Sequence, residues 1–566
     1  MANRGVSRLA PAVGAALAAG LLVAPPGQAD LADITMRTAF DIRIDGTVPD
    51  SAREVTRVGD VNGDGVDDLL VGEAPIEYYG RAQSGTLNVV FGGVTGPVDL
   101  GALGDRGFRI TTASPEDGWG TSSVDGAGDI DGDGYDDLVI GVPSATQNSR
   151  FISGAAYVVR GGAAPGDVDL ADLGSRGFRI DGAATGDGLG WSVAGAGDVN
   201  RDGYDDIVLG ARNAENNDRE RSGSAYVVFG GSTDPLDLAA LGNRGFRIDG
   251  AAPNDWLGDS VAGAVDVDAD GIDDLLLGAI AADHNGVDGS GSVYVVWGGT
   301  TADVDLADLG DRGFRIDGAQ RYGQLGVSVA GAGDVNADGV DDLLLGAWGE
   351  DHGAGSVYVV FGGDGRPLDL RTLGSRGFRI DGIAQVGDEL AGTGDVDADG
   401  YDDLLLGTFG GAYLVFGGTA RTVALSHPGN RALRIKGARK PVAGPGDINR
   451  DGYADLLVGD RRHAYVLYGR PRATLNVKAR TRTRKVNATA RTRLVRRITV
   501  GSGQQARVTV KVLPKKAGKT VTVKATKKRV VVRTRNTPRK TRIRVRIASS
   551  APDHFTKTWT RTWRVR

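Results

Sequence analysis

The sequence predicts an all-β protein: a seven-bladed β-propeller closed by an N-terminal strand, followed by a small β-sandwich domain. Seven acidic nine-residue loops begin at residues 60, 129, 198, 266, 334, 395 and 447, so one unit recurs every 52 to 69 residues. Each loop is followed by short apolar and alternating runs bounded by Gly and Asp, a pattern typical of strands in repeated β architectures. The charge divides the chain: residues 471–566 hold 30 Lys and Arg and one acid, although the whole chain carries a net charge of only −6. This asymmetry predicts a separate basic domain.

Residues 1–29 have the pattern of a secretory signal peptide. Arg4 and Arg8 precede an apolar run, and the small residues Gly27 and Ala29 fit cleavage after Ala29. The alternative, a membrane anchor, is less favoured because a span needs ~20 apolar residues. We therefore expect a secreted or extracellular protein, either free or associated with the cell envelope, without a transmembrane segment after cleavage. The chain contains no cysteine, which excludes disulfides and thiolate metal sites.

Residues 30–470 are expected to form the propeller, with four strands in each unit. In the fifth unit these are the run that leads into the acidic loop, the run Leu343–Gly346, the run Ser356–Gly363 and an RGFRI segment at Arg376. The seventh unit lacks the fourth strand, and Phe40–Gly46 resembles it. We expect this N-terminal segment to complete the seventh blade and so to remove an exposed edge.

The acidic loops predict calcium sites. Side-chain oxygens at positions 1, 3, 5 and 9 and the carbonyl at position 7 form the hard oxygen cage that Ca²⁺ prefers, and Gly at position 6 permits the sharp turn. An EF-hand would need Glu at position 12, where this chain has apolar residues such as Val71. The alternative, plain hairpin turns, leaves several neighbouring carboxylates repelling one another in every loop. The predicted ligands, one Ca²⁺ per blade and up to seven in all, are Asp60, Asn62, Asp64, Val66, Asp68, Asp129, Asp131, Asp133, Tyr135, Asp137, Asp198, Asn200, Asp202, Tyr204, Asp206, Asp266, Asp268, Asp270, Ile272, Asp274, Asp334, Asn336, Asp338, Val340, Asp342, Asp395, Asp397, Asp399, Tyr401, Asp403, Asp447, Asn449, Asp451, Tyr453 and Asp455.

The run GVSVAGAGDVNADGVDDLLLGAWG (Gly326–Gly349), followed by SVYVVFGG, resembles the FG-GAP repeat of integrin α-subunit N-terminal propellers. Similar arrays occur in bacterial secreted proteins. The resemblance covers residues 40–470 and implies that the acidic loops bind calcium through the positions given above. Two features depart from it: all seven units keep the loop, and the cysteines common in integrin propellers are absent.

The face opposite the acidic loops is expected to carry the variable connections, where binding usually occurs. The expected partner there is an extracellular protein or a glycan. The candidate ligand-contact residues are Tyr78, Tyr79, Phe151, Arg212, Arg219, Trp256 and Tyr322.

Residues 471–566 are predicted to form a basic, Ig-like β-sandwich, because runs such as Thr541–Ile547 alternate strictly between apolar and cationic residues. A cationic face suits an anionic polymer of the cell envelope; docking on the acidic propeller is the alternative. Sequence-specific nucleic-acid binding is not expected, because the cations lack regularly interleaved aromatics.

These features together predict a secreted, calcium-stabilised binding or adhesion module. The alternatives are a secreted hydrolase, because FG-GAP arrays accompany some phospholipase D-type enzymes, and a purely structural envelope protein. The chain has no G-x-S-x-G or H-E-x-x-H motif. No catalytic residue is therefore predicted, although Asp283-His284 and Asp351-His352 fall at the same offset from their loops.

Overall fold

The computed structural model describes residues 34–35, 40–48, 51–73, 85–111, 123–383, 385–419, 422–429, 431–460 and 462–471, and the backbone of eight strands between residues 475 and 565. The predicted signal peptide and the candidate ligand residues Tyr78 and Tyr79 lie outside these ranges.

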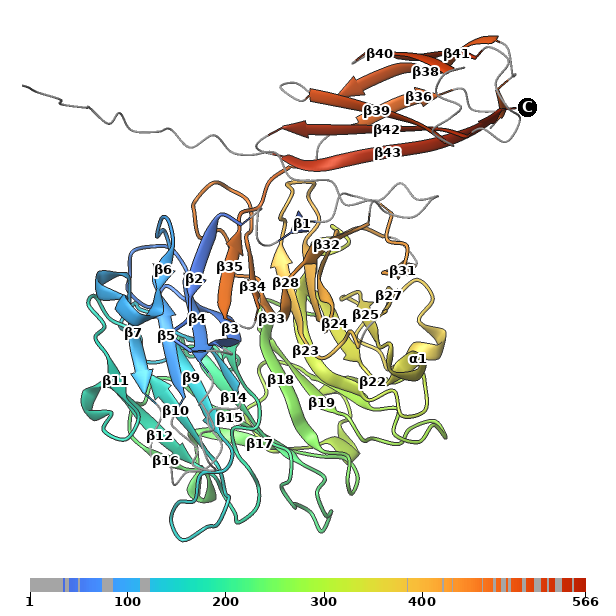
Figure 1. Cartoon of the computed structure of the whole chain (residues 1–566). Helices are drawn as coiled ribbons and strands as arrows, with labels where there is room; N and C mark the ends of the chain where they lie inside the picture. The colour runs from blue at the N-terminus through green and yellow to red at the C-terminus, as the bar shows by residue number, and fades with distance from the viewer. Residues whose placement is uncertain are drawn as a thin grey trace, which may run out of the picture.

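Seven sheets surround a central axis and form the predicted seven-bladed β-propeller (Figure 1). Four antiparallel strands, A to D, make up each blade, and the acidic loop joins A to B. The A strands are β3 (Ser51–Gly59), β8 (Ser123–Gly128), β13 (Val193–Gly197), β18 (Leu257–Val265), β23 (Leu325–Gly333), β28 (Leu390–Gly394) and β33 (Arg439–Ala443). The B strands are β4 (Asp68–Glu73), β9 (Asp137–Val142), β14 (Asp206–Ala211), β19 (Asp274–Ala279), β24 (Asp342–Ala347), β29 (Asp403–Thr408) and β34 (Leu456–Gly459).

The outer half of each blade holds strands C and D. The C strands are β5 (Thr86–Val90), β10 (Ala155–Val159), β15 (Ser224–Val228), β20 (Ser292–Val296), β25 (Ser356–Val360), β30 (Gly411–Val415) and β35 (His463–Leu467). The D strands are β7 (Gly107–Thr111), β12 (Gly177–Asp181), β17 (Gly245–Asp249), β22 (Gly313–Asp317), β27 (Gly377–Asp381), β32 (Ala432–Lys436) and β2 (Ile42–Asp45).

A short fifth strand, which the sequence did not predict, lies on the outside of every blade. It comes from the segment before strand D of the following unit and pairs in parallel with strand D of the preceding blade. For blades one to seven these strands are β11 (Val168–Asp169), β16 (Leu236–Asp237), β21 (Val304–Asp305), β26 (Leu368–Asp369), β31 (Thr422–Ala424), β1 (Ile34–Thr35) and β6 (Val98–Asp99). Each unit therefore ties itself to the blade before it.

The ring closes through the N-terminal segment, as predicted. Strand β2 pairs antiparallel with β35, with Ile44 opposite Ala464. Strand β1 pairs in parallel with β32, with Ile34 opposite Ile435. The segment therefore completes blade six as well as blade seven.

Seven apolar clusters fill the seven interfaces between neighbouring blades. The cluster between blades one and two, for example, joins Leu70 and Phe108 to Ile140 and Tyr157. The B strands supply much of this core, since runs such as Asp342–Ala347 are buried along their whole length. Burying each large apolar side chain contributes about 1.5–3 kcal/mol. Apolar packing between blades thus supplies the cohesion that a chain without cysteine cannot take from disulfides.

Short helical elements lie between these strands. One α-helix, α1 (Glu350–Gly353), lies in the B–C connection of blade five. The 3₁₀ turns are η2 (Leu100–Ala102), η3 (Gly104–Arg106), η5 (Gly174–Arg176), η6 (Leu238–Ala240), η7 (Leu306–Asp308) and η8 (Leu370–Thr372). Among the described residues, no helix has the length and apolar character of a membrane span.

The basic C-terminal region contributes two four-stranded sheets. One contains β36 (Leu475–Ala479), β38 (Ala490–Val500), β41 (Arg529–Thr534) and β40 (Val521–Thr526). The other contains β37 (Lys485–Val486), β43 (His554–Val565), β42 (Arg542–Ala551) and β39 (Gln505–Leu513). The β character expected of residues 471–566 is therefore present.

Candidate metal centres

The seven acidic loops share one backbone conformation. In the fifth loop, Asp334 at position 1 accepts hydrogen bonds from the backbone N–H of Asp338 (2.9 Å) and of Gly339 (2.9 Å). The same pair of bonds recurs in the other six loops. The Gly at position 6 has φ between 80° and 91° in every loop, a left-handed conformation that favours glycine. The loop therefore folds back on itself, and its side-chain oxygens converge.

The structure brings predicted ligands together in space. Carboxylate oxygens within 4.8 Å of one another come from Asp129, Asp131 and Asp137 in the second loop, Asp266, Asp268 and Asp274 in the fourth, and Asp395, Asp397 and Asp399 in the sixth. These are the three loops with Asp at position 3; the other four have Asn there. A cluster of oxygen donors suits a hard divalent cation, so the acidic groups are positioned to hold a metal ion.

The aspartate at position 9 is buried and tethers the loop. Asp342 Oδ2 accepts a hydrogen bond from Val335 N (3.0 Å), and its Oδ1 accepts one from Gly362 N (3.1 Å), in the glycine turn after strand C. Equivalent pairs occur in the other six units. Position 9 thus links strands A, B and C of its blade, a role the sequence reasoning did not assign.

Burial of the position-9 carboxyl groups perturbs their acidity. It raises the pKa of Asp342 to about 7 and those of Asp68 and Asp137 to about 8, and the other carboxylates of each loop add to the effect. Proximity to like charges and loss of solvation both disfavour the ionised form. A bound divalent cation would oppose both effects, which fits these residues to a metal ion.

The aspartate at position 8 links neighbouring loops, and the sequence analysis missed it. Asp136 Oδ2 accepts a hydrogen bond from Asp60 N of the preceding loop (2.7 Å), and Asp205 accepts the equivalent bond from Asp129 N (2.8 Å). Asp occupies this position in six loops, and Ala454 replaces it in the seventh. This recurrence could have indicated a separate role for position 8, because the predicted calcium cage uses only positions 1, 3, 5, 7 and 9. These hydrogen bonds link loop one to loop two, loop two to loop three and loop five to loop six.

On the opposite face, two candidate ligand residues expose their rings. Phe151 is 66% exposed and Tyr322 is 59% exposed. Trp256 is only half-buried, but it lies 5.5 Å from the guanidinium of Arg212, which also stacks on Trp191 at 3.3 Å. Arg212 Nη1 also donates a hydrogen bond to Asp259 Oδ1, at 2.5 Å.

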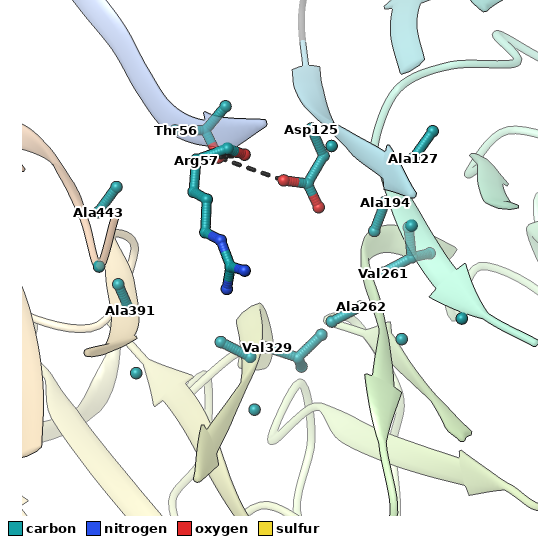
Figure 2. Close-up of a pocket in the computed structure, with 18 of the residues that line it drawn as sticks. Thr56, Arg57, Asp125, Ala127, Ala194, Val261, Ala262, Val329, Ala391 and Ala443 are labelled. Atoms are coloured by element: carbon teal, nitrogen blue, oxygen red, sulfur yellow. Dashed lines mark hydrogen bonds between the residues drawn. The ribbon is translucent and has the colours of Figure 1, made fainter. Parts of the chain in front are cut away.

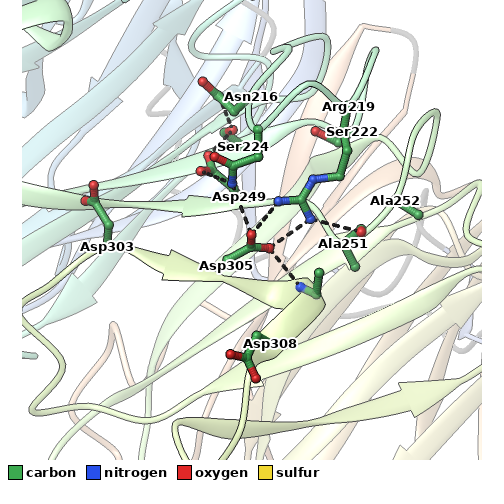
Figure 3. Close-up of polar contacts among 12 residues, drawn as sticks. Asn216, Arg219, Ser222, Ser224, Asp249, Ala251, Ala252, Asp303, Asp305 and Asp308 are labelled. Carbon is green, nitrogen blue, oxygen red and sulfur yellow. Dashed lines mark hydrogen bonds and ion pairs between the residues drawn. The ribbon is translucent and has the colours of Figure 1, made fainter.

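Arg219, another candidate ligand residue, is held within the protein (Figure 3). Its guanidinium makes two contacts with Asp305 of strand β21, at 2.8 and 2.5 Å, and also donates to the Ala251 carbonyl. The Arg219 guanidinium holds the pKa of Asp305 below its usual range. These bonds tie the B–C loop of blade three to the fifth strand of the same sheet.

The D–A turns on this face place large side chains on unfavourable backbone. In blade three the turn uses Gly186 and Gly188, with φ of 91° and 66°. Blade five has Tyr322 and Gln324 at the equivalent places with φ of 56° and 55°, and Trp256 of blade four has φ of 57°. A non-glycine residue in this region costs roughly 1–2 kcal/mol. Strain of this kind gathers at functional sites.

The two Asp-His pairs do not form matching arrangements. Asp283 accepts a hydrogen bond from Gly289 N (2.5 Å), and the His284 ring lies 3.5 Å from the Tyr294 hydroxyl. Asp351 instead forms an ion pair with Arg379. Each acid therefore serves a local structural contact.

Comparison with known proteins agrees with the fold. The FG-GAP repeat family model matches residues 121–159 and 189–228, in blades two and three. The chain is 30% identical over 268 residues to integrin alpha pat-2 of Caenorhabditis elegans, covering 44% of this chain and 20% of the relative. It is 29% identical over 232 residues to integrin alpha-5 of Xenopus laevis (39% and 20%), and 30% identical over 161 residues to phosphatidylinositol-glycan-specific phospholipase D of Bos taurus (28% and 18%). The matches thus span about a fifth of the length of these relatives. The chain carries an FG-GAP-repeat β-propeller similar to the N-terminal propeller of integrin α-subunits.

Proposed function

We propose that this chain is an extracellular binding or adhesion module whose propeller binds a protein or glycan ligand on the face opposite the acidic loops. The observation that carries the proposal is the left-handed backbone of the exposed Tyr322 and the half-buried Trp256, where the turn of blade three has glycine. Such strain persists only where the surrounding structure sustains it, and it clusters at binding sites. The exposed Phe151 and Tyr322 rings supply aromatic contact area of the kind found at recognition surfaces.

The acidic face has a different role in this proposal. Each loop takes one Ca²⁺, up to seven in all, through its side-chain oxygens and the carbonyl at position 7. Because position-8 aspartates join three pairs of neighbouring loops, a cation in one loop of such a pair also stabilises the other. A cation that binds the folded chain alone stabilises it in proportion to the logarithm of its concentration.

The basic region gives the module an anchor. After cleavage at Ala29, residues 30–470 form the propeller and residues 471–566 form a separate, Ig-like β-sandwich. Its 30 Lys and Arg against one acid favour an anionic polymer of the cell envelope. Binding of this kind weakens with ionic strength, because exposed charges are screened beyond about 8–10 Å at physiological salt.

The test measures binding of the calcium-loaded chain to a panel of immobilised extracellular-matrix proteins and glycans. We expect a defined subset to bind, and Tyr322→Ala and Phe151→Ala to weaken that binding. The matched control is Tyr204→Ala, which removes an aromatic side chain from the acidic-loop face, keeps the backbone carbonyl predicted to bind Ca²⁺, and should leave ligand binding unchanged. Binding that survives both substitutions, or that is lost equally in the control, would place recognition elsewhere.

A further inference from the structure

A cavity of about 530 Å³ lies on the propeller axis and is lined by the A strands of all seven blades (Figure 2). The volume falls in the range of small-molecule sites, about 300–1,000 Å³. The proposed ligand face does not use this cavity, and the acidic loops reach it only through the position-8 residues Asp205 and Asp273.

The lining follows the repeat in most blades and departs from it in two. Three residues before the acidic loop, six units have glycine, and four residues before it, five units have alanine. Blade one instead has Arg57 and Thr56 at these places, and blade two has Asp125 in place of the alanine. Thr56 Oγ1 donates to Asp125 Oδ1 at 3.2 Å. The departures therefore lie side by side and form one polar wall.

The ionisable groups that line the cavity are unequal in charge: Arg57 is the cation, and Asp125, Asp205 and Asp273 are the acids. The Arg57 Nε is already paired with Asp67 at 2.9 Å. Asp125 accepts a hydrogen bond from the Thr56 hydroxyl and interacts with the backbone N–H groups of Gly126 and Gly195. The opposite charges of Arg57 and Glu54 lie within electrostatic range of it. The cavity thus holds excess negative charge, which favours a cationic occupant.

Apolar side chains also contribute to the lining: Val55, Val261, Val329, Leu390 and Val442, of which each valine is 6% exposed. A bare metal ion would leave this surface and most of the volume unused, since one water fills only about 30 Å³. An aliphatic chain with a cationic end would contact both the acidic and the apolar residues of the lining. Arg57 is itself such a group, an aliphatic stem with a cationic end, and Figure 2 shows its guanidinium pointing into the cavity.

We propose that the axial cavity binds a small organic cation, an ammonium or guanidinium group on a short aliphatic chain, with Asp125 as its main charged contact. Asp205 and Asp273 lie at the end of the cavity nearest the acidic loops and attract the same charge. Arg57 repels the ligand and so limits its affinity. Neutralising Asp125 and neutralising Arg57 should therefore change ligand affinity in opposite directions, and this difference tests whether the ligand is a cation.

The test titrates the calcium-loaded full chain with butylammonium and, as an anion of the same length, butyrate, by calorimetry and ligand-observed NMR. We expect butylammonium to bind and butyrate not to bind. Asp125→Asn should weaken butylammonium binding by about tenfold or more, because a charge-assisted hydrogen bond is replaced by a neutral one. Arg57→Gln should strengthen it. The control Asp308→Asn makes the same change in η7, outside the cavity lining, and should have no effect.

Several results would overturn the proposal. These are butyrate binding that Arg57→Gln abolishes, butylammonium binding unchanged in Asp125→Asn, or no binding of butylammonium at millimolar concentration. Asp273→Asn guards against a folding defect in the first variant, because it removes a different carboxylate from the same cavity. If both Asn variants melt like the parent chain and neither weakens binding, the cavity does not select cations.

Discussion

The position-9 aspartate offers a test that separates tethering from metal binding. In Asp342→Ala, the backbone N–H of Gly362 loses its acceptor and that of Val335 keeps only the Gly333 carbonyl, at a site where the aspartate is 0% exposed. Each buried donor left without a partner costs about 1–3 kcal/mol. Removing the carboxylate also removes the cost of burying it, which its raised pKa reflects. We therefore expect a net loss of about 1–3 kcal/mol in the free energy of unfolding, set mainly by the Gly362 donor.

The matched variant is Asp338→Ala at position 5, which removes a carboxylate from an exposed part of the same loop. Urea unfolding of both variants is compared in excess chelator and in millimolar calcium. Asp342→Ala should lower stability in both conditions, whereas Asp338→Ala should lower it mainly in calcium. If the two variants were equally stable in chelator, position 9 would be a metal ligand without a tethering role.

Three further predictions concern closure, acidity and metal content. Ile44→Ala, which removes a side chain only 1% exposed from the closing strand, should cost about 2–5 kcal/mol in urea unfolding; a loss below about 1 kcal/mol would mean that β2 contributes little to the ring. Burial and, to a smaller extent, the charge of Glu54 raise the pKa of Glu389 from an ordinary value of 4.5 to about 8. The folded chain therefore binds this proton more tightly than the unfolded chain does. The free energy of unfolding falls as the pH rises from about 5 to 8. Glu389→Gln should raise the melting temperature at pH 8 and reduce its slope over that range; an unchanged slope contradicts the assignment. Chelation should lower the melting temperature substantially, and elemental analysis of the dialysed protein should find several Ca²⁺ per chain; equal melting temperatures with and without calcium would show that the loops do not stabilise the ring.

The fold was predictable from the sequence to the level of blades and strands, because the repeat is nearly regular. The loop spacing gave the number of blades, and the likeness of Phe40–Gly46 to later units gave the closing strand. The fifth strands were not predictable. Segments such as Val168–Asp169 are two residues long, too short for a periodic pattern, and their pairing is set by the neighbouring blade.

The candidate site was predictable in its loops and less so around them. Ligand spacing shows which oxygens of one loop converge, but the bond from Asp60 N to Asp136 joins residues 76 apart. The same limit applies to the ligand face. The residues next to Arg219 in the sequence are polar and predict an exposed side chain. In the structure Arg219 pairs with Asp305, 86 residues away. Tyr322 stays 59% exposed although the guanidinium of Arg321 lies over its ring at 4.7 Å, and this contact joins neighbours in sequence rather than distant segments.

The pairing of β2 with β35 has a consequence for biosynthesis. Ile44 cannot pair with Ala464 until that residue has been synthesised. At a translation rate of ~5–20 residues per second, the delay is roughly 20–80 s. During that interval blades two to five can assemble in order, each docking on the one before, while β2 has only the two-residue strand β6 to pair with. A chaperone or export factor that holds an extended β segment would therefore act first on the N-terminal end, and release of that end would be the last step of maturation.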